Sequence, residues 1–99
     1  MAVQNKPGFQ LIRGSITDDA EFVGNGQNSE YEFVAIAEFQ PHDPDKDLET
    51  LTLLIPAWLW ERRFELFRAG HHLFVEGIVD KRAPAMYLSD AWYWRGQGL

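Results

Sequence analysis

The sequence predicts an all-β domain with one helix, built as a five-stranded Greek-key barrel in the order β-β-β-α-β-β. Three observations support this prediction. The chain has 99 residues, which is enough for one domain and too few for two, since domains run from about 50 to 250 residues. Five short runs rich in β-branched and aromatic residues are typical of strands. A single segment with helical periodicity lies between the third and fourth runs, and strands that helices do not separate argue against a parallel doubly wound sheet.

The first two strands are predicted to follow a loose arm at residues 1–8. Residues 9–17 form the first expected strand, and Gly14 within it indicates a bulge or a sharp bend. The glycine-rich residues 24–29 predict a turn, because glycine takes positive φ without steric cost. The second strand covers residues 31–39, and its side chains alternate between two faces. One face carries Val34 and Ile36, and the other carries Tyr31, Phe33, Ala35, Ala37 and Phe39.

The third strand leads into the expected helix. A polar loop at residues 41–49 precedes a strand at residues 50–55. Pro56 then marks a boundary, because its fixed φ suits the first turn of a helix. Residues 57–69 fit a helix of about three and a half turns, which Gly70 ends as a left-handed stop. The inward side chains expected from the strand are Leu51, Leu53 and Ile55. The helical apolar seam is expected to be Trp60, Phe64 and Phe67, with Leu59 and Leu66 beside them.

Two further strands complete the pattern, at residues 72–79 and 85–94. The buried side chains expected from the fourth strand are Leu73 and Val75. The domain then covers residues 9–95, and residues 96–99 form a short tail. A lone helix that plugs one end of a five-stranded barrel is the pattern of the OB-fold. A five-stranded open sheet covered by the helix stays open as the alternative, because periodicity alone does not separate the two.

Composition and charge exclude several classes of protein. The chain has no cysteine, which excludes disulfides, thiolate catalysis and cysteine-based metal sites. No apolar run is long enough to span a membrane, so we expect a soluble, cytoplasmic protein. The net charge is −6, which argues against strong non-specific binding to duplex DNA. The charge is uneven, with three basic and ten acidic residues in positions 1–60 and six basic and five acidic residues thereafter, so a local basic groove is still allowed.

Two segments resemble a known family. In residues 53–77 a strand leads into an amphipathic helix, and the glycine after the helix opens a strand with aliphatic and glycine positions. Those positions are Gly70, Leu73, Val75 and Gly77, with Glu76 before the last. Residues 11–17 and the acidic turn after them are similar to the opening strand of the same family. The segments resemble bacterial single-stranded-DNA-binding proteins, and the length resembles their short primosomal replication protein B branch. The resemblance implies an OB-fold, single-stranded DNA as ligand, contact with replication proteins, and a homodimer or homotetramer.

Candidate base-stacking residues lie on the second and third strands, which form the usual binding face of an OB-fold. Tyr31, Phe33 and Phe39 form an aromatic row that is expected to face outward, with Phe33 beside Thr52 as a platform. Stacking of a base on an exposed ring contributes about 1–3 kcal/mol, whatever the base. The alternative is that these rings pack against a partner subunit or a long loop.

The cationic candidates are Arg13 and the Lys81–Arg82 pair. In a barrel, the loop that holds the pair can lie beside a binding groove, where guanidinium groups bind phosphates through paired hydrogen bonds. The alternative is a solvated hairpin tip. Trp94 is an interface candidate, whereas Trp92 is expected to be buried at the barrel end. The predicted nucleic-acid-binding residues are Arg13, Phe33, Phe39, Thr52, Phe74, Lys81, Arg82 and Trp94.

No motif in the sequence indicates catalysis. The acidic residues 42–49 lack the glycine and the final carboxylate that a calcium loop requires. His71 and His72 are adjacent and point to opposite faces of a strand, so they cannot share a metal ion. We therefore expect no enzyme, no metal and no cofactor.

The resulting hypothesis is sequence-tolerant binding of single-stranded DNA in replication, repair or recombination, with RNA left open as a ligand. The second hypothesis is an OB-fold module for protein–protein interaction with little affinity for nucleic acid. The acidic first half favours it, as do Thr50, Pro56 and Ala83, which stand where the resembled family has aromatic residues.

Overall fold

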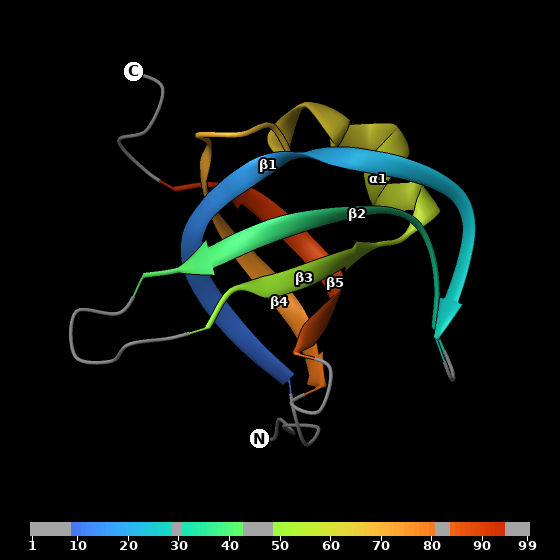
Figure 1. Ribbon diagram of the computed structural model, residues 1–99, viewed down its shortest axis with the longest axis horizontal. Helices are drawn as coiled ribbons and strands as arrows, with labels where there is room; N and C mark the ends of the chain where they lie inside the picture. The colour runs from blue at the N-terminus through green and yellow to red at the C-terminus, as the bar shows by residue number, and fades with distance from the viewer. Residues whose placement is uncertain (1–8, 29–30, 43–48, 81–83, 95–99) are drawn as a thin grey trace.

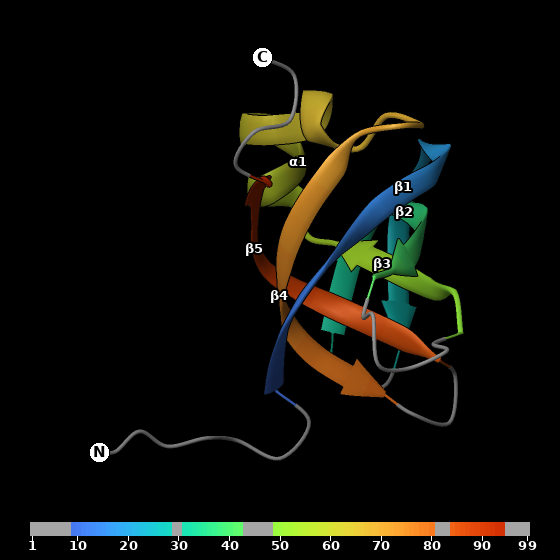
Figure 2. The same cartoon turned by 90° about the vertical axis from the view of Figure 1, so that its left-hand side faces the viewer.

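A computed structural model describes residues 9–28, 31–42, 49–80 and 84–94. The strands form a closed barrel in the order β1-β2-β3-β5-β4, and the helix lies across one end of it (Figures 1 and 2). This confirms the predicted order β-β-β-α-β-β and excludes the open sheet; the architecture is consistent with an OB-like fold. The elements are β1 (Phe9–Asn28), β2 (Tyr31–Pro41), β3 (Leu51–Ile55), α1 (Ala57–Arg63), the 3₁₀ helix η1 (Phe64–Leu66), β4 (His72–Asp80) and β5 (Ala85–Tyr93).

Strand β1 is longer than predicted and pairs with two neighbouring strands. Residues 9–15 pair with β4, and residues 14–28 pair with β2. Gly14 lies in the overlap, where a Cβ would collide with the Gln40 carbonyl oxygen. The turn predicted at residues 24–29 is wrong for residues 24–28, which lie in the strand. Three register shifts against β2 absorb the extra residues, and Gly24 takes a φ of 86° within the last shifted stretch.

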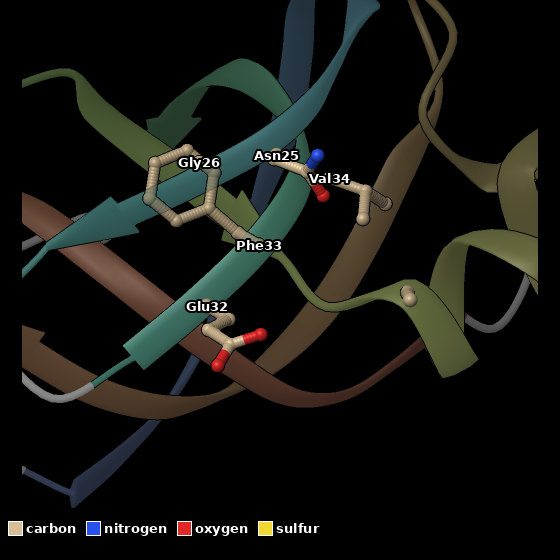
Figure 3. Close-up of a pocket in the computed structure, with 6 residues that line it drawn as sticks. Asn25, Gly26, Glu32, Phe33 and Val34 are labelled. Atoms are coloured by element: carbon tan, nitrogen blue, oxygen red, sulfur yellow. The ribbon is translucent and has the colours of Figure 1, made fainter.

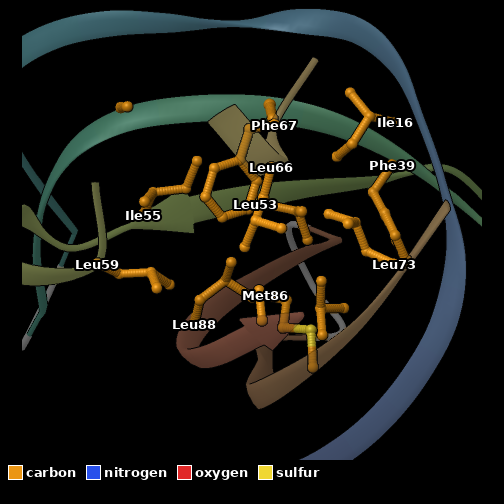
Figure 4. Close-up of a cluster of buried hydrophobic side chains, with 14 of the residues drawn as sticks. Ile16, Phe39, Leu53, Ile55, Leu59, Leu66, Phe67, Leu73, Met86 and Leu88 are labelled. Atoms are coloured by element: carbon orange, nitrogen blue, oxygen red, sulfur yellow. The ribbon is translucent and has the colours of Figure 1, made fainter. Parts of the chain in front are cut away.

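The barrel interior is filled by the inward side chains of every strand (Figure 4). The predicted inward residues of β3 and β4 are confirmed, because Leu53, Ile55, Leu73 and Val75 are completely buried. The outward placement of Phe39 is wrong, since its exposed fraction is 0%. Phe39 shares its strand face with Ala35 and Ala37, and all three side chains are buried in the barrel core.

The helix is shorter than the predicted span of residues 57–69. Arg63 leaves the helical region, with φ −138° and ψ 37°, and the chain continues as η1. A 3₁₀ turn holds about 3.0 residues rather than 3.6, so the face toward the core rotates. Phe64 is therefore 57% exposed, and the predicted seam is wrong at this position. The other predicted residues Leu59, Leu66 and Phe67 are buried, and Trp60 is partly buried.

The helical segment ends as the sequence predicts. Gly70 takes a φ of 92°, and its N–H donates to the Ile16 carbonyl at 2.8 Å, which ties the stop to β1. Arg63 donates to the Glu65 carboxylate at 2.9 Å, and this hydrogen bond lowers the pKa of Glu65. In the described residues no helix is long and apolar enough to cross a membrane.

One parallel pairing closes the barrel. Strands β3 and β5 pair over only three positions, from Thr52 with Ala85 to Leu54 with Tyr87. Beside this seam, β4 and β5 shift register between Glu76 and Gly77. A Cβ on Gly77 would collide with the Tyr87 backbone, so a glycine is required at this close approach.

Candidate nucleic-acid interface

A group of rings gathers on the outer face of β1, β4 and β5. Arg13 pairs in register with Phe74, and Phe74 pairs with Trp92, so all three side chains point outward in one row. The Phe74 and Trp92 rings are stacked, with centroids 6.0 Å apart and planes inclined by 24°. Trp92 is 36% exposed, so its expected burial at the barrel end is wrong. The barrel thus presents an aromatic surface on the strands opposite β2 and β3.

Arg13 extends this surface toward the end of β5. Its guanidinium lies 4.6 Å from the centroid of the Trp94 ring, within the range of a cation–π contact. Two backbone hydrogen bonds fix the geometry: the Trp94 N–H donates to the His72 carbonyl, and the His42 N–H donates to the Arg13 carbonyl, both at 2.9 Å. The Trp94 ring packs edge-on against His42 and more obliquely against His72, at centroid distances of 6.4 and 5.7 Å.

The two histidines complete the cluster. Their rings meet edge to face with centroids 5.7 Å apart, and the His42 Nε2 lies 3.1 Å from the Ser15 hydroxyl. The buried Nδ1 of His72 has no hydrogen-bond partner among the described residues. We call Arg13, His42, His72, Phe74, Trp92 and Trp94 the ring surface.

A pair of carboxylates bounds the ring surface. Glu76 and Asp90 pair in register, two residues from Phe74 and Trp92 on the same outer face. Asp90 is exposed, and its carboxylate accepts the Ala91 N–H at 2.8 Å. Negative charge therefore begins about 7 Å along the strands from the stacked rings.

The predicted platform of Phe33 and Thr52 does not exist. Thr52 pairs with Glu38, five positions along β2 from Phe33, and alternation puts the two side chains on opposite faces. Phe33 packs over Gly26, where a Cβ would collide with its ring. It lines a separate pocket of about 280 Å³, between the end of the β1–β2 hairpin and the start of α1 (Figure 3). The other lining residues are Asn25, Gly26, Glu32, Val34 and Ala57.

The outer face of β2 and β3 is acidic. The Thr52 hydroxyl donates to the Glu38 carboxylate at 3.1 Å, which engages the hydroxyl that was a predicted DNA contact. Asp18 of β1 pairs with Glu38, and Glu21 pairs with Ile36. Residues 16–28 of β1, all of β2 and all of β3 contain no lysine or arginine. We call Asp18, Glu21 and Glu38 the acidic face, because negative charge there is not offset by a lysine or arginine on these strands.

The structure therefore divides the predicted site residues. It brings Arg13, Phe74 and Trp94 together, and it separates Phe33, Phe39 and Thr52 from them. Lys81 and Arg82 lie outside the described residues. Sequence reasoning missed His42, His72 and Trp92. For His72 and Trp92 the signal was the alternation of β4 and β5, which puts both outward with Phe74 once the strand register is known. His42 follows β2, and alternation along β4 and β5 gives no signal for it.

Among the described residues, no three of the histidines and carboxylates lie close enough together to hold a metal ion. No protein-family model matches the chain, and no curated protein matches it. The resemblance to single-stranded-DNA-binding proteins thus depends on the sequence features given above.

Proposed function

We propose that this protein binds single-stranded DNA on the ring surface, without sequence preference, in replication, repair or recombination. The observation that carries the proposal is the Arg13 guanidinium over Trp94, beside the stacked Phe74 and Trp92 rings. Rings and a cation in one surface are what an unpaired strand requires, because its bases stack and its phosphates need positive charge.

Each component of the ring surface has a defined role. Trp92 offers an exposed face to a base, and such stacking contributes about 1–3 kcal/mol. The edge of the Arg13 guanidinium can bind a phosphate through two hydrogen bonds while its face stays on the Trp94 ring. Because the proposed contacts are stacking and phosphate binding, without hydrogen bonds to base edges, the surface should bind DNA of any sequence.

The carboxylates of Glu76 and Asp90 limit the length of strand that fits. A strand that extends past Phe74 and Trp92 along β4 and β5 meets this pair. The site therefore suits a short segment, near the lower end of the roughly 4–16 nucleotides that one OB-fold binds.

Fluorescence titration tests this function. Oligo-dT should quench tryptophan emission, and the affinity should fall as salt rises. The substitution Arg13→Gln should weaken binding about 10-fold, because charge-assisted hydrogen bonds contribute about 1.5–3 kcal/mol. Arg68→Gln is the matched control, since it removes the same charge from an exposed position after η1. Equal loss in both variants, or no quenching at low salt, contradicts the proposal. A parallel titration with oligo-rU compares RNA with DNA.

A specific observation favours the second candidate, a module for protein–protein interaction. The acidic face occupies β2 and β3, the strands through which OB-folds usually bind oligonucleotides. A basic protein segment would be attracted to Asp18, Glu21 and Glu38, which repel DNA. Absence of DNA binding together with capture of a basic replication protein through these residues would favour this candidate.

A further inference from the structure

Two histidines of the ring surface take no part in the stacking or in the phosphate contact proposed above. One of them, His72, pairs in register with Ser15, and alternation puts both side chains on the outer face, two residues along from Arg13 and Phe74. The Trp94 N–H donates to the His72 carbonyl oxygen, which places Trp94 beside the same pair. This end of the ring surface therefore holds a hydroxyl, an imidazole and an indole.

The second histidine, His42, reaches the same place from the end of β2. Its N–H donates to the Arg13 carbonyl oxygen at 2.9 Å, and its Nε2 lies 3.1 Å from the Ser15 hydroxyl. Its ring meets that of His72 edge to face, with centroids 5.7 Å apart. Both imidazoles and the Arg13 guanidinium pack around the Trp94 ring. The cation that would bind a phosphate thus has two imidazoles beside it.

The two imidazoles differ in how well their surroundings accept a proton. A charged imidazole carries a hydrogen on both ring nitrogens. The Nδ1 of His72 is buried without a partner among the described residues, so the charged form of His72 would bury an N–H that nothing accepts, which is costly. The Nε2 of His42 instead faces the Ser15 hydroxyl, whose oxygen can accept a hydrogen. His42 is therefore the better proton acceptor of the two.

Few charged side chains surround His42 in the part of the chain that the structure describes. Arg13 is the neighbouring cation, and no carboxylate in that part forms an ion pair with His42. Residues 43–48 lie outside it. The other charged groups on the elements around His42 are Asp18 and Glu38 beyond Ser15, Glu76 and Asp90 beyond Phe74, and Glu49 before β3. A phosphate bound by Arg13 would therefore bring to His42 a negative charge that these residues do not place in contact with it.

We propose that His42 takes up a proton from solvent when single-stranded DNA binds, so that the affinity for the strand rises as the pH falls. The pH response rests on the proposed function, because it needs a phosphate at Arg13. An opposite charge nearby favours the charged imidazole, so the complex holds more protons at His42 than the free protein does. Coupling is reciprocal, so added protons strengthen DNA binding by the same factor. Histidine changes its charge between about pH 5 and 8, which sets the range of the response.

Titration with oligo-dT at two pH values and one ionic strength tests the response. The unmodified chain should bind about 5-fold more tightly at about pH 5.5 than at about pH 8, because one half-buried imidazole becomes charged beside a phosphate. His42→Gln should lose this difference, although its amide can still hydrogen-bond Ser15. His71→Gln is the matched control and should keep the difference. It removes the same titratable group from the opposite strand face, where the His71 Nδ1 lies 3.1 Å from the Leu66 carbonyl oxygen.

Calorimetry measures the proton itself. Binding of oligo-dT in two buffers of different ionisation enthalpy, at about pH 7, should show net proton uptake by the unmodified chain and by His71→Gln, and none by His42→Gln. Thermal melting should show that both variants fold. Equal affinity at the two pH values, or proton uptake that survives His42→Gln, would overturn the pH response and leave the DNA-binding function standing. Absence of oligo-dT binding at both pH values would overturn the two together.

Discussion

The two outer faces of this barrel differ in chemistry although both come from strands that alternate in the same way. The outer face of β2 and β3 carries Asp18, Glu21 and Glu38, with Thr52 bonded to a carboxylate. The outer face of β1, β4 and β5 carries stacked rings and Arg13. The barrel determines which side chains point outward, but the residue types at those positions determine the charge and the aromatic content of each face. An OB-like topology is therefore insufficient to locate a binding site.

The largest expected effect is on the free energy of unfolding, and it distinguishes Phe39 inside the barrel from Phe74 on its outer face. Phe39→Ala should lower the free energy of unfolding by about 3–5 kcal/mol, because it leaves a cavity in the barrel core. Phe74→Ala should cost much less stability, since Phe74 lies on the outer face, and should weaken DNA binding instead. Urea denaturation of both variants measures the difference. Similar destabilisation by the two substitutions would contradict this assignment of inside and outside.

Trp92→Ala should produce the next largest effect, on binding rather than on stability. Loss of a stacking platform costs about 1–3 kcal/mol, which corresponds to a 5- to 150-fold weaker complex with oligo-dT. Thr52→Ala, on the acidic face, is the control and should leave the affinity unchanged. Fluorescence anisotropy of labelled oligo-dT gives both values. If Thr52→Ala has the larger effect, DNA binds on the β2–β3 face.

Removal of the boundary carboxylates should strengthen binding by a smaller factor. Glu76→Gln with Asp90→Asn should raise the affinity for long oligo-dT about 5-fold, because two repulsive charges leave the edge of the ring surface. The matched control, Glu21→Gln with Glu38→Gln, changes the net charge equally on the acidic face and should have less effect. Equal gains in the two variants would indicate that only the net charge matters.

The smallest effect concerns the Arg63–Glu65 ion pair, which lies on neither face. Both side chains are well exposed, so the pair stabilises the fold weakly. The hydrogen bond from Arg63 lowers the pKa of Glu65 below its ordinary value of 4.5. The contribution is therefore present above pH 4.5 and is lost as the pH falls through the depressed pKa. Arg63→Ala should lower the melting temperature slightly at pH 7 and leave it unchanged near pH 2.

The sequence alone predicted the barrel better than it predicted the site. Alternation identified Leu53, Ile55, Leu73 and Val75 as inward because one face of each strand is apolar throughout. On β2 the same rule indicates the inward face, since Ala35, Ala37 and Phe39 share an apolar face and Glu38 lies on the other. Phe39 was nevertheless predicted to face outward, because the second strand of an OB-fold usually contributes to its binding face.

The helix and the ring surface show the same limit. The glycine at position 70 predicted the left-handed turn that ends the helical segment. No residue predicted that Arg63 would leave the helical conformation and that Phe64 would then face solvent. Arg13, Phe74 and Trp94 were predicted one by one, and only the registers of β1, β4 and β5 bring them together. Side chains distant in sequence form a surface through tertiary pairing, which is the part that local patterns do not contain.

The short parallel seam between β3 and β5 has a consequence for how the molecule opens. It joins residues that are more than thirty positions apart in the chain, and three paired positions are all that hold it. Parallel pairs are slightly less stable per residue, and distant segments are costly to bring together. Amide hydrogens along Thr52–Leu54 should exchange with deuterium sooner than those of the longer β1–β2 ladder. The barrel should therefore open first between β3 and β5.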